Sequence, residues 1–169
     1  MKKIVYLAHI MLLVSILGSC AKAPPQFSDE TINPGDKIGD FFITTGDGDE
    51  VIFVTKLHCP FDNSTQTESC EQPVGTKVNV SQGVFVDPSL GKTLDELWSE
   101  QSHEMFIEDR PVNLKAFGPV DFNNPIVGTV RVWNVAIVTD KPGKITARSK
   151  GVVGGESWNY TAIISFTKP

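Results

Sequence analysis

The stretch WNYTAIISFT (residues 158–167) decides the fold that this sequence predicts. Its bulky or apolar side chains fall on alternate positions, and polar residues fill most of the positions between them. Successive side chains of a β-strand point to opposite faces, so this period of two is typical of a strand with one buried face. The side chains expected on the buried face are Trp158, Tyr160, Ala162, Ile164 and Phe166.

Other strand-forming runs precede this one along the chain. TVRVWNVAIVT (residues 129–139) is apolar on both faces and is expected to be a central strand. Two runs flank the turn-forming GDGDE (residues 46–50) and are expected to pair as a hairpin, and Gly83 is expected to mark a bulge. The runs before the last one occupy residues 40–45, 51–58, 76–86, 104–108, 112–117, 129–139 and 144–153.

One short helix is expected to begin after Thr93. Thr93 and Glu96 have the spacing of a capping box, and Leu94, Leu97 and Trp98 share one helical face. About eight strands with one short helix predict an all-β fold, an antiparallel β-sandwich of Ig-like or jelly-roll type. A closed barrel is the alternative arrangement of the same strands.

The composition indicates a folded chain, since hydrophobic residues make up 40% and charged residues 21% of its 169 residues. The formal charge of −5 becomes −7 after residue 19, where 13 basic and 20 acidic residues remain. No block of basic residues appears in that part of the sequence. The charge pattern therefore argues against nucleic acid or an anionic lipid surface as a partner.

The first residues have the pattern of a signal peptide. Lys2 and Lys3 precede a largely apolar run over residues 4–17. A helix of that length spans about 21 Å, less than the roughly 30 Å hydrocarbon core of a bilayer, so a permanent membrane span is disfavoured. A short apolar segment between a positive head and small residues is typical of a secretory leader.

The leader ends in the motif L-G-S-C (residues 17–20), which resembles the lipobox of bacterial lipoproteins. The resemblance implies that residues 1–19 are a removable signal peptide and that the thiol of Cys20 is acylated. It places the protein in the cell envelope, at the outer membrane or on the outer face of the cytoplasmic membrane. Residues 20–33, with Pro24 and Pro25, are then expected to be a lipidated tether, and residues 34–169 a single β-sandwich domain.

With Cys20 assigned to lipid, Cys59 and Cys70 remain in an oxidising compartment and are expected to form a disulfide. Closing so short a loop stabilises a fold by roughly 3 kcal/mol on the chain-entropy model. A metal site that combines the two cysteines with His58 is the alternative. Its spacing does not match the common zinc sites.

The sequence lacks the motifs of common enzymes, including G-x-S-x-G, H-E-x-x-H and a Gly-rich phosphate loop. We therefore expect no enzyme activity and no cofactor, and we expect His58 and His103 to be surface or loop-edge residues. A hydrolase that uses two carboxylates is the remaining enzymatic hypothesis. Two adjacent acidic pairs are available to it, Asp95-Glu96 and Glu108-Asp109.

The GDGDE loop brings three carboxylates together, and Asp47, Asp49 and Glu50 are weak candidates for a calcium site. The EF-hand pattern fails at residues 51–53, which are apolar. A solvated hairpin tip that holds no metal is the simpler interpretation.

The three tryptophans, Trp98, Trp133 and Trp158, are expected to pack in the core. If one of them is an exposed platform for a sugar, Trp158 is the candidate, because it follows the Gly154-Gly155 turn. Tyr160 lies on the same strand face and is the second residue of this possible ligand site.

The leading hypothesis is a lipid-anchored lipoprotein of the cell envelope whose β-sandwich binds an envelope protein or a polysaccharide without catalysis. One alternative is a β-barrel carrier of a small apolar ligand. The carboxylate-dependent hydrolase is the less favoured alternative.

Overall fold

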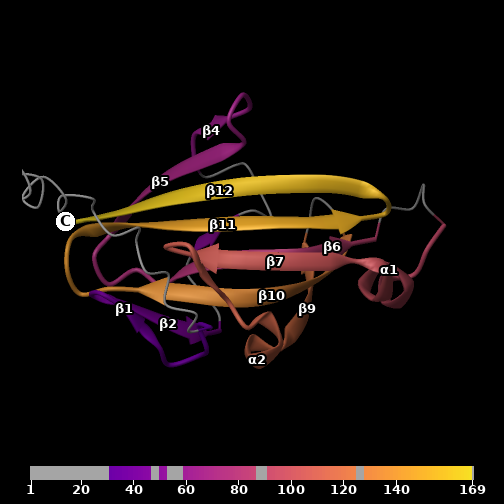
Figure 1. Cartoon of the computed structure of the whole chain (residues 1–169), viewed down its shortest axis with the longest axis horizontal. Coiled ribbons are helices and arrows are strands. Elements are labelled where there is room, and N and C mark those ends of the chain that lie inside the picture. The colour runs from indigo at the N-terminus through magenta and orange to yellow at the C-terminus, as the bar shows by residue number, and fades with distance from the viewer. Residues whose placement is uncertain (1–30, 47–49, 53–58, 87–90, 125–127, 169) are drawn as a thin grey trace, which may run out of the picture.

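The computed structural model describes residues 31–46, 50–52, 59–86, 91–124 and 128–168. Twelve strands and two short helices are seen in these residues (Figure 1). The strands form two open six-stranded sheets that pack face to face, rather than a closed barrel. The all-β sandwich that the alternating sequence predicts is therefore confirmed.

Sheet 1 is built around β10, the strand that the sequence places at the centre, and β9 pairs with β10 beside the main path. In spatial order its strands are β1 (Lys37–Ile38), β2 (Phe41–Thr45), β10 (Gly128–Val138), β6 (Val78–Phe85) and β3 (Glu50–Ile52), with β9 (Pro119–Asn124) alongside β10.

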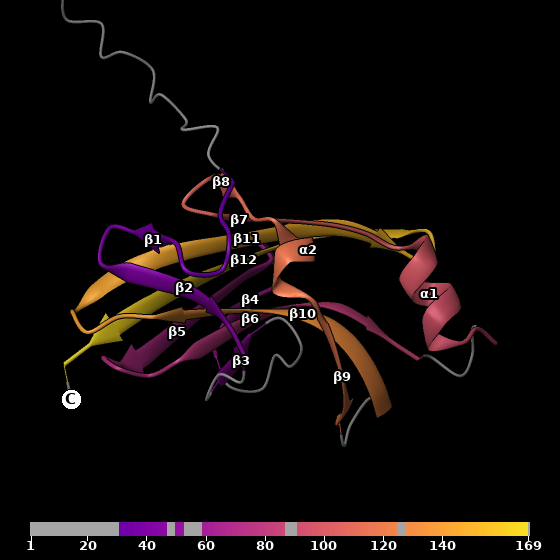
Figure 2. The same cartoon turned by 90° about the horizontal axis from the view of Figure 1, so that it is seen from below.

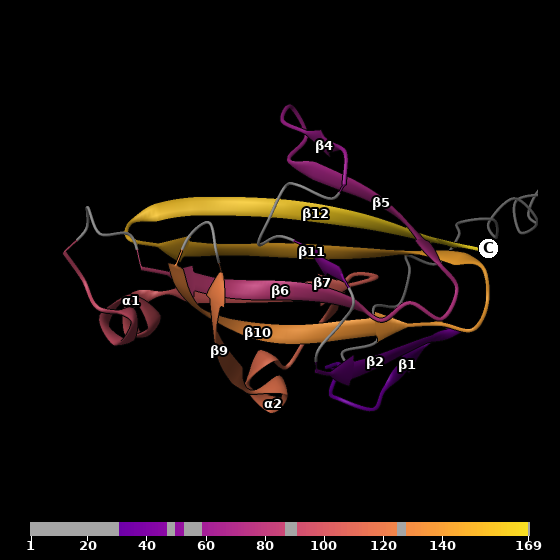
Figure 3. The same cartoon turned by 180° about the vertical axis from the view of Figure 1, so that it is seen from behind.

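Sheet 2 is built around the long hairpin of β11 and β12, whose turn is Gly154-Gly155. Figure 3 shows β4 and β5 at its edge, next to β12. In spatial order its strands are β4 (Phe61–Asp62), β5 (Thr67–Pro73), β12 (Glu156–Thr167), β11 (Gly143–Val153), β7 (Ser102–Ile107) and β8 (Arg110–Pro111).

The core lies between the sheets and consists mainly of aliphatic side chains on alternate strand positions. Ala162, Ile164 and Phe166 of β12 are buried, as the period of two predicts, and they belong to the same core cluster as Val135 and Ile137 of β10. Each buried methylene stabilises the fold by about 0.8 kcal/mol, so this interface holds the two sheets together.

Two short links carry the chain between the sheets at the same end of the sandwich. Residues 74–77 join β5 to β6, and residues 139–142 join β10 to β11. The links are bonded to each other, because the backbone N–H of Gly75 donates to the carbonyl of Thr139 over 2.9 Å. At the opposite end the chain passes from β6 to β7 through helix α1 (Leu94–Glu100), which Figure 2 shows at that end of the molecule.

Helix α1 begins as the sequence predicts. The Thr93 hydroxyl accepts from the backbone N–H of Glu96, and the Glu96 carboxylate accepts from the backbone N–H of Thr93. Leu97 is buried, whereas Leu94 and Trp98 are half-buried. Neither described helix has the length and apolarity needed to cross a membrane.

Residues 112–117 are not a strand, as the sequence analysis expected, because they contain the short helix α2 (Leu114–Phe117). Leu114 and Phe117 are both buried, and a spacing of three places them on one helical face. Gly118 ends the helix with φ = 69°, a conformation that glycine adopts without steric cost. Before α2 the chain reverses between β7 and β8, where Glu108 and Asp109 have positive φ.

The expected hairpin around GDGDE is wrong. β2 and β3 lie in the same sheet but are separated by β10 and β6, and β3 pairs with β6 in parallel. Ile43 of β2 is fully buried beside its partner Ile137, so pairing with the apolar central strand outweighs the local turn signal. A second parallel pair, β5 with β12, means that the sandwich is mixed rather than wholly antiparallel.

Gly83 does not mark a bulge, because the pairing of β6 with β10 runs through it without interruption. It marks a close approach of two backbones. A Cβ atom at this position would lie 1.9 Å from the carbonyl oxygen of Arg131. Glycine is therefore needed here because the backbones of β6 and β10 approach closely, and not because β6 contains a bulge.

Candidate functional site

Six ring-bearing side chains form a continuous row at the α1 end of the sandwich. We call this set the aromatic row. Neighbouring ring centroids are 4.3 to 6.0 Å apart, so each ring packs against the next. In spatial order the row consists of Trp98, Trp133, His103, Trp158, Tyr160 and Phe61.

The two sheets and helix α1 all contribute to the row. Trp133 of β10 lies 4.3 Å from Trp98 of α1 and 5.4 Å from His103 of β7. His103 lies 5.0 Å from Trp158 of β12, whose ring is nearly parallel to that of Tyr160 at an interplanar angle of 20°. The row therefore joins sheet 1 to sheet 2 where the helix closes the sandwich.

Gly151 makes the contact between His103 and Trp158 possible. These two residues pair with Gly151 from opposite sides, so their side chains flank β11 on the same face. A Cβ at Gly151 would lie 2.8 Å from Cζ2 of Trp158 and 2.1 Å from the carbonyl oxygen of Ser102. The missing side chain leaves the space in which the two rings meet.

Every member of the aromatic row is half-buried. Phe166, further along the inward face of β12, is by contrast 2% exposed. The aromatic residues thus present part of their surface to solvent while packing against one another. Such large, partly exposed rings are the side chains that most often anchor ligands and partners.

His103, a member of the row, forms a polar pair with Gln101, which lies beside the row. A short hydrogen bond joins Nε2 of His103 to Oε1 of Gln101. Nδ1 of His103 and Nε2 of Gln101 are buried and have no hydrogen-bond partner among the described residues. Burial lowers the pKa of His103 to about 4, so its imidazole is neutral at pH 7.

Arg131 stands at the Trp98 end of the row, with its guanidinium 5.7 Å from the Trp98 ring centroid. It donates to both carboxylate oxygens of Asp121 over 2.6 and 2.8 Å, and to Asp95 over 2.7 Å. The Arg131 hydrogen bonds lower the pKa of Asp121. Two carboxylates around one guanidinium leave this end of the row with a net negative charge.

The disulfide lies at the Phe61 end of the row. Cys59 and Cys70 are bonded, with their Cα atoms 5.0 Å apart, which confirms the pairing predicted from the cysteine count. The bond closes the β4–β5 hairpin that carries Phe61, whose ring contacts Tyr160 at 6.0 Å. Asp62 follows, and hydrogen bonds from Ser64 lower its pKa.

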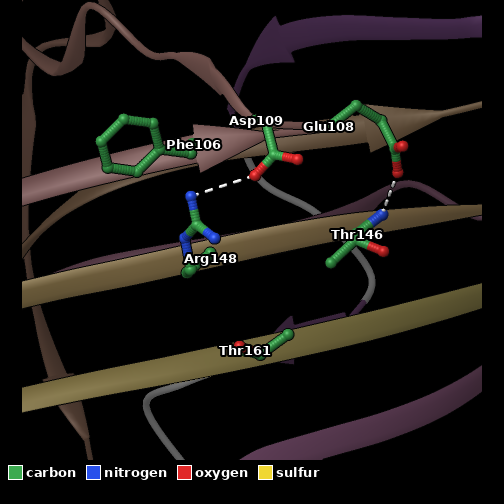
Figure 4. Close-up of a pocket in the computed structure, with 6 residues that line it drawn as sticks. All are labelled: Phe106, Glu108, Asp109, Thr146, Arg148 and Thr161. Atoms are coloured by element: carbon green, nitrogen blue, oxygen red, sulfur yellow. Dashed lines mark hydrogen bonds and ion pairs between the residues drawn. The ribbon is translucent and has the colours of Figure 1, made fainter. Parts of the chain in front are cut away.

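A shallow pocket of about 250 Å³ lies on the other face of sheet 2 (Figure 4). Its Arg148 side chain pairs with Asp109 over 3.0 Å, and its Glu108 carboxylate accepts from the backbone N–H of Thr146 over 2.6 Å. The cation and both carboxylates are thus engaged within the pocket. The complete lining is Phe106, Glu108, Asp109, Thr146, Arg148 and Thr161.

The acidic pairs that the hydrolase hypothesis requires have structural partners. Asp95 binds Arg131, and hydrogen bonds from Thr93 lower the pKa of Glu96. A general acid at neutral pH needs a raised pKa instead. Glu108 and Asp109 are held as described for the pocket, so neither pair has the arrangement of a catalytic acid and base.

The structure brings Trp158 and Tyr160, the two predicted ligand-site residues, into direct contact within the aromatic row. Cys20, Asp47 and Asp49 lie outside the described residues, and of Glu50 only the backbone is described. Among the residues that the structure describes, no group of three His, Cys, Asp or Glu side chains is placed to hold a metal ion.

Sequence reasoning missed His103, Phe61, Gln101 and Gly151. His103 was expected at a surface or loop edge, but it occupies the middle of the row. The alternation of His103 with the buried Met105 and Ile107 is a signal that places it on the inward face. For Gly151 the sequence contains no comparable signal, because its role depends on pairing with two distant strands.

No protein-family model and no curated protein sequence matches the chain. Among solved structures, the chain is similar to the cysteine protease inhibitor EhICP2 from Entamoeba histolytica. The two share 11% sequence identity at a TM-score of 0.32, over 70% of this chain and 96% of that one. Similarity at this level carries no inference about ligand or partner.

Proposed function

We propose that this protein is a lipid-anchored, non-catalytic binding module of the cell envelope, and that the aromatic row binds a polysaccharide. The observation that carries the proposal is the row itself, six contacting rings that are all half-buried. Aromatic faces carry negative charge density, and the polarised C–H groups of a sugar ring pack against them. A row of rings offers several such contacts to one chain.

Polar groups beside the rings complete the kind of surface that sugar hydroxyls require. Gln101, His103 and the Arg131–Asp121 pair all lie against members of the row. Ligand sites are typically apolar surfaces with a few polar groups that fix orientation. The aromatic row, rather than the pocket on the other face of sheet 2, has this combination.

Tryptophan fluorescence tests the proposal directly, because all three tryptophans of the chain belong to the row. Soluble oligosaccharides, neutral and acidic, are titrated into the full-length chain in detergent. At least one is expected to shift the emission, and Trp158→Ala is expected to weaken its binding at least tenfold. Phe85→Ala, which removes an exposed ring outside the row, is the matched control and should bind normally.

If no sugar shifts the emission, polysaccharide binding is wrong. An envelope protein is the second candidate partner, and the composition of the site favours it specifically. Tryptophan, tyrosine and arginine dominate the energetic centres of protein interfaces. Here Arg131 lies against Trp98 and pairs with two exposed carboxylates, those of Asp95 and Asp121. Crosslinking at Trp98 in the native envelope, compared with crosslinking at Phe85, distinguishes a protein partner from a glycan.

The anchor rests on the L-G-S-C motif and needs its own test. Two or three acyl chains hold a protein stably at a membrane, whereas one chain holds it marginally. Cys20→Ser is expected to abolish incorporation of labelled palmitate and to leave an unprocessed or mislocalised precursor. Normal acylation and processing of the variant would contradict the anchor without affecting the binding proposal.

A further inference from the structure

We infer that the aromatic row recognises an uncharged polysaccharide, and that His103 and Gln101 are the residues that select it through its hydroxyl groups. This inference rests on the proposed function and narrows it from polysaccharides in general to neutral ones. It follows from the two unpartnered atoms of the polar pair and from the charges around the row.

The polar pair offers one donor and one acceptor. If Oε1 of Gln101 accepts the proton on Nε2 of His103, then Nδ1 of His103 is a free acceptor and Nε2 of Gln101 a free donor. If the amide is turned over, Nδ1 becomes the donor and the amide oxygen the acceptor. Either orientation of the amide leaves one free hydrogen-bond donor and one free acceptor.

A hydroxyl group matches this pair, because it donates one hydrogen bond and accepts others. A carboxylate, sulfate or phosphate only accepts, so it satisfies the donor and leaves the buried acceptor without a partner. Leaving a buried polar atom unpaired is costly, and this cost is the usual source of strong discrimination between related ligands. The pair therefore favours a hydroxyl over an acid group at the position of the sugar that lies against it, and the charges around the row decide between neutral and acidic polymers.

The charges along the row favour a neutral polymer over an acidic one. Arg131 is held by Asp95 and Asp121, which together outweigh its charge. Asp62 is exposed at the Phe61 end. Since His103 is neutral at pH 7, an acidic polymer would meet carboxylates at both ends of the row and no free cation among its described residues.

Access to the pair requires a side-chain movement, because both unpartnered atoms are buried in the free protein. We expect the side chain of Gln101 to make this movement. This residue stands at the C-cap of α1, between the helix and β7, where it belongs to neither regular element. Its side chain can rotate without breaking a strand pair, and this rotation gives a ligand hydroxyl access to Nδ1 of His103 and Nε2 of Gln101.

The test compares neutral with acidic probes on the full-length chain. Cello-, malto- and laminari-oligosaccharides are the neutral probes, and oligogalacturonate and oligoalginate are the acidic ones. We expect a neutral probe to bind at least tenfold more tightly than either acidic probe, with no change between low and high salt. Tighter binding of an acidic probe, weakened by salt, would overturn the inference but leave the proposed function standing.

Two substitutions test the polar pair. His103→Phe keeps a ring in the row but removes both nitrogens, and Gln101→Leu removes the amide at similar size. Each is expected to weaken the neutral probe about tenfold, whereas Gln72→Leu, the same change on β5, should not. Unchanged binding in both folded variants would overturn the role of the pair. The comparison of neutral and acidic probes needs no variant, so it holds even if a variant fails to fold.

Discussion

The two ends of the sandwich differ in the side chains that lie between the sheets. At the end with the short links, Ile137, Ile145 and Ile164 fill the space between the sheets and are fully buried. At the α1 end the same strand faces carry Trp133 and Trp158, with His103 between them, all half-buried. The aliphatic end contributes stability through burial, whereas the aromatic end keeps surface available for contact. Substitutions should therefore separate folding from binding along one strand, β12.

The largest expected effect on stability is at the aliphatic end. Ile164→Ala removes a fully buried side chain and leaves a cavity between the sheets. It should lower the free energy of unfolding by about 3 to 4 kcal/mol, measured by urea denaturation. Sugar binding by the folded fraction should be unchanged, because Ile164 belongs to the core cluster and not to the row. Loss of binding in the folded variant would mean that the two ends are coupled.

Gly151→Ala adds a side chain at the position where His103 and Trp158 meet across β11. The new Cβ would lie 2.1 Å from the carbonyl oxygen of Ser102, which the strand pairing holds in place. We expect a loss of about 2 to 3 kcal/mol and a changed near-ultraviolet spectrum from the displaced Trp158. Gly155→Ala is the control, since no atom lies near its Cβ, and its positive φ should cost about 1 kcal/mol.

A pH titration distinguishes the two ends through His103. Its pKa is about 4 in the folded protein against an ordinary 6.5, so the unfolded chain takes up the proton first as the pH falls. The stability that the neutral histidine contributes is complete above pH 6.5 and should be lost between pH 6.5 and 4. The full shift corresponds to about 3 kcal/mol, and solvent screening of the partly exposed ring reduces the expected loss to about 2 kcal/mol. His103→Phe should remove this part of the pH dependence. An identical slope in the variant would mean that other groups carry it.

The smallest expected effect concerns the helix that carries Trp98. Thr93→Ala removes the side-chain half of the capping box. It should cost about 1 kcal/mol in global stability, measured by thermal unfolding. Thr44→Ala on β2, where the hydroxyl donates a long hydrogen bond of 3.4 Å to the neighbouring Thr45 carbonyl, is the control and should cost less. Equal losses would show that the cap contributes nothing to holding Trp98.

The sequence predicts the parts of this fold that depend on local pattern. The alternation of β12, the apolar centre of β10, the capping box of α1 and the Cys59–Cys70 disulfide all follow from residues close together in the chain. The parallel pairing of β3 with β6 and the closeness of Gly83 to Arg131 do not, because they join segments distant in sequence.

The candidate site shows the same division. Trp158 and Tyr160 are recognisable from their strand and its turn, but their neighbours come from β4, β7, β10 and α1. Trp133 and Trp98 were expected in the core, where aromatic residues usually lie. They are half-buried because the row stands where the sandwich ends, and only the assembled sheets define that position.

The two short links tie the sheets together beside the most deeply buried part of the core, which contains Ile137 and Ile145. Residues 74–77 and 139–142 cross between the sheets at one end, and the bond from Gly75 to Thr139 ties the crossings together. Further along β10 the sheets are joined by the crossing from β8 to β9 through α2, and the side chains of the aromatic row are only half-buried. Amide hydrogen exchange should accordingly be slowest beside Ile137 and should quicken along β10 toward Trp133.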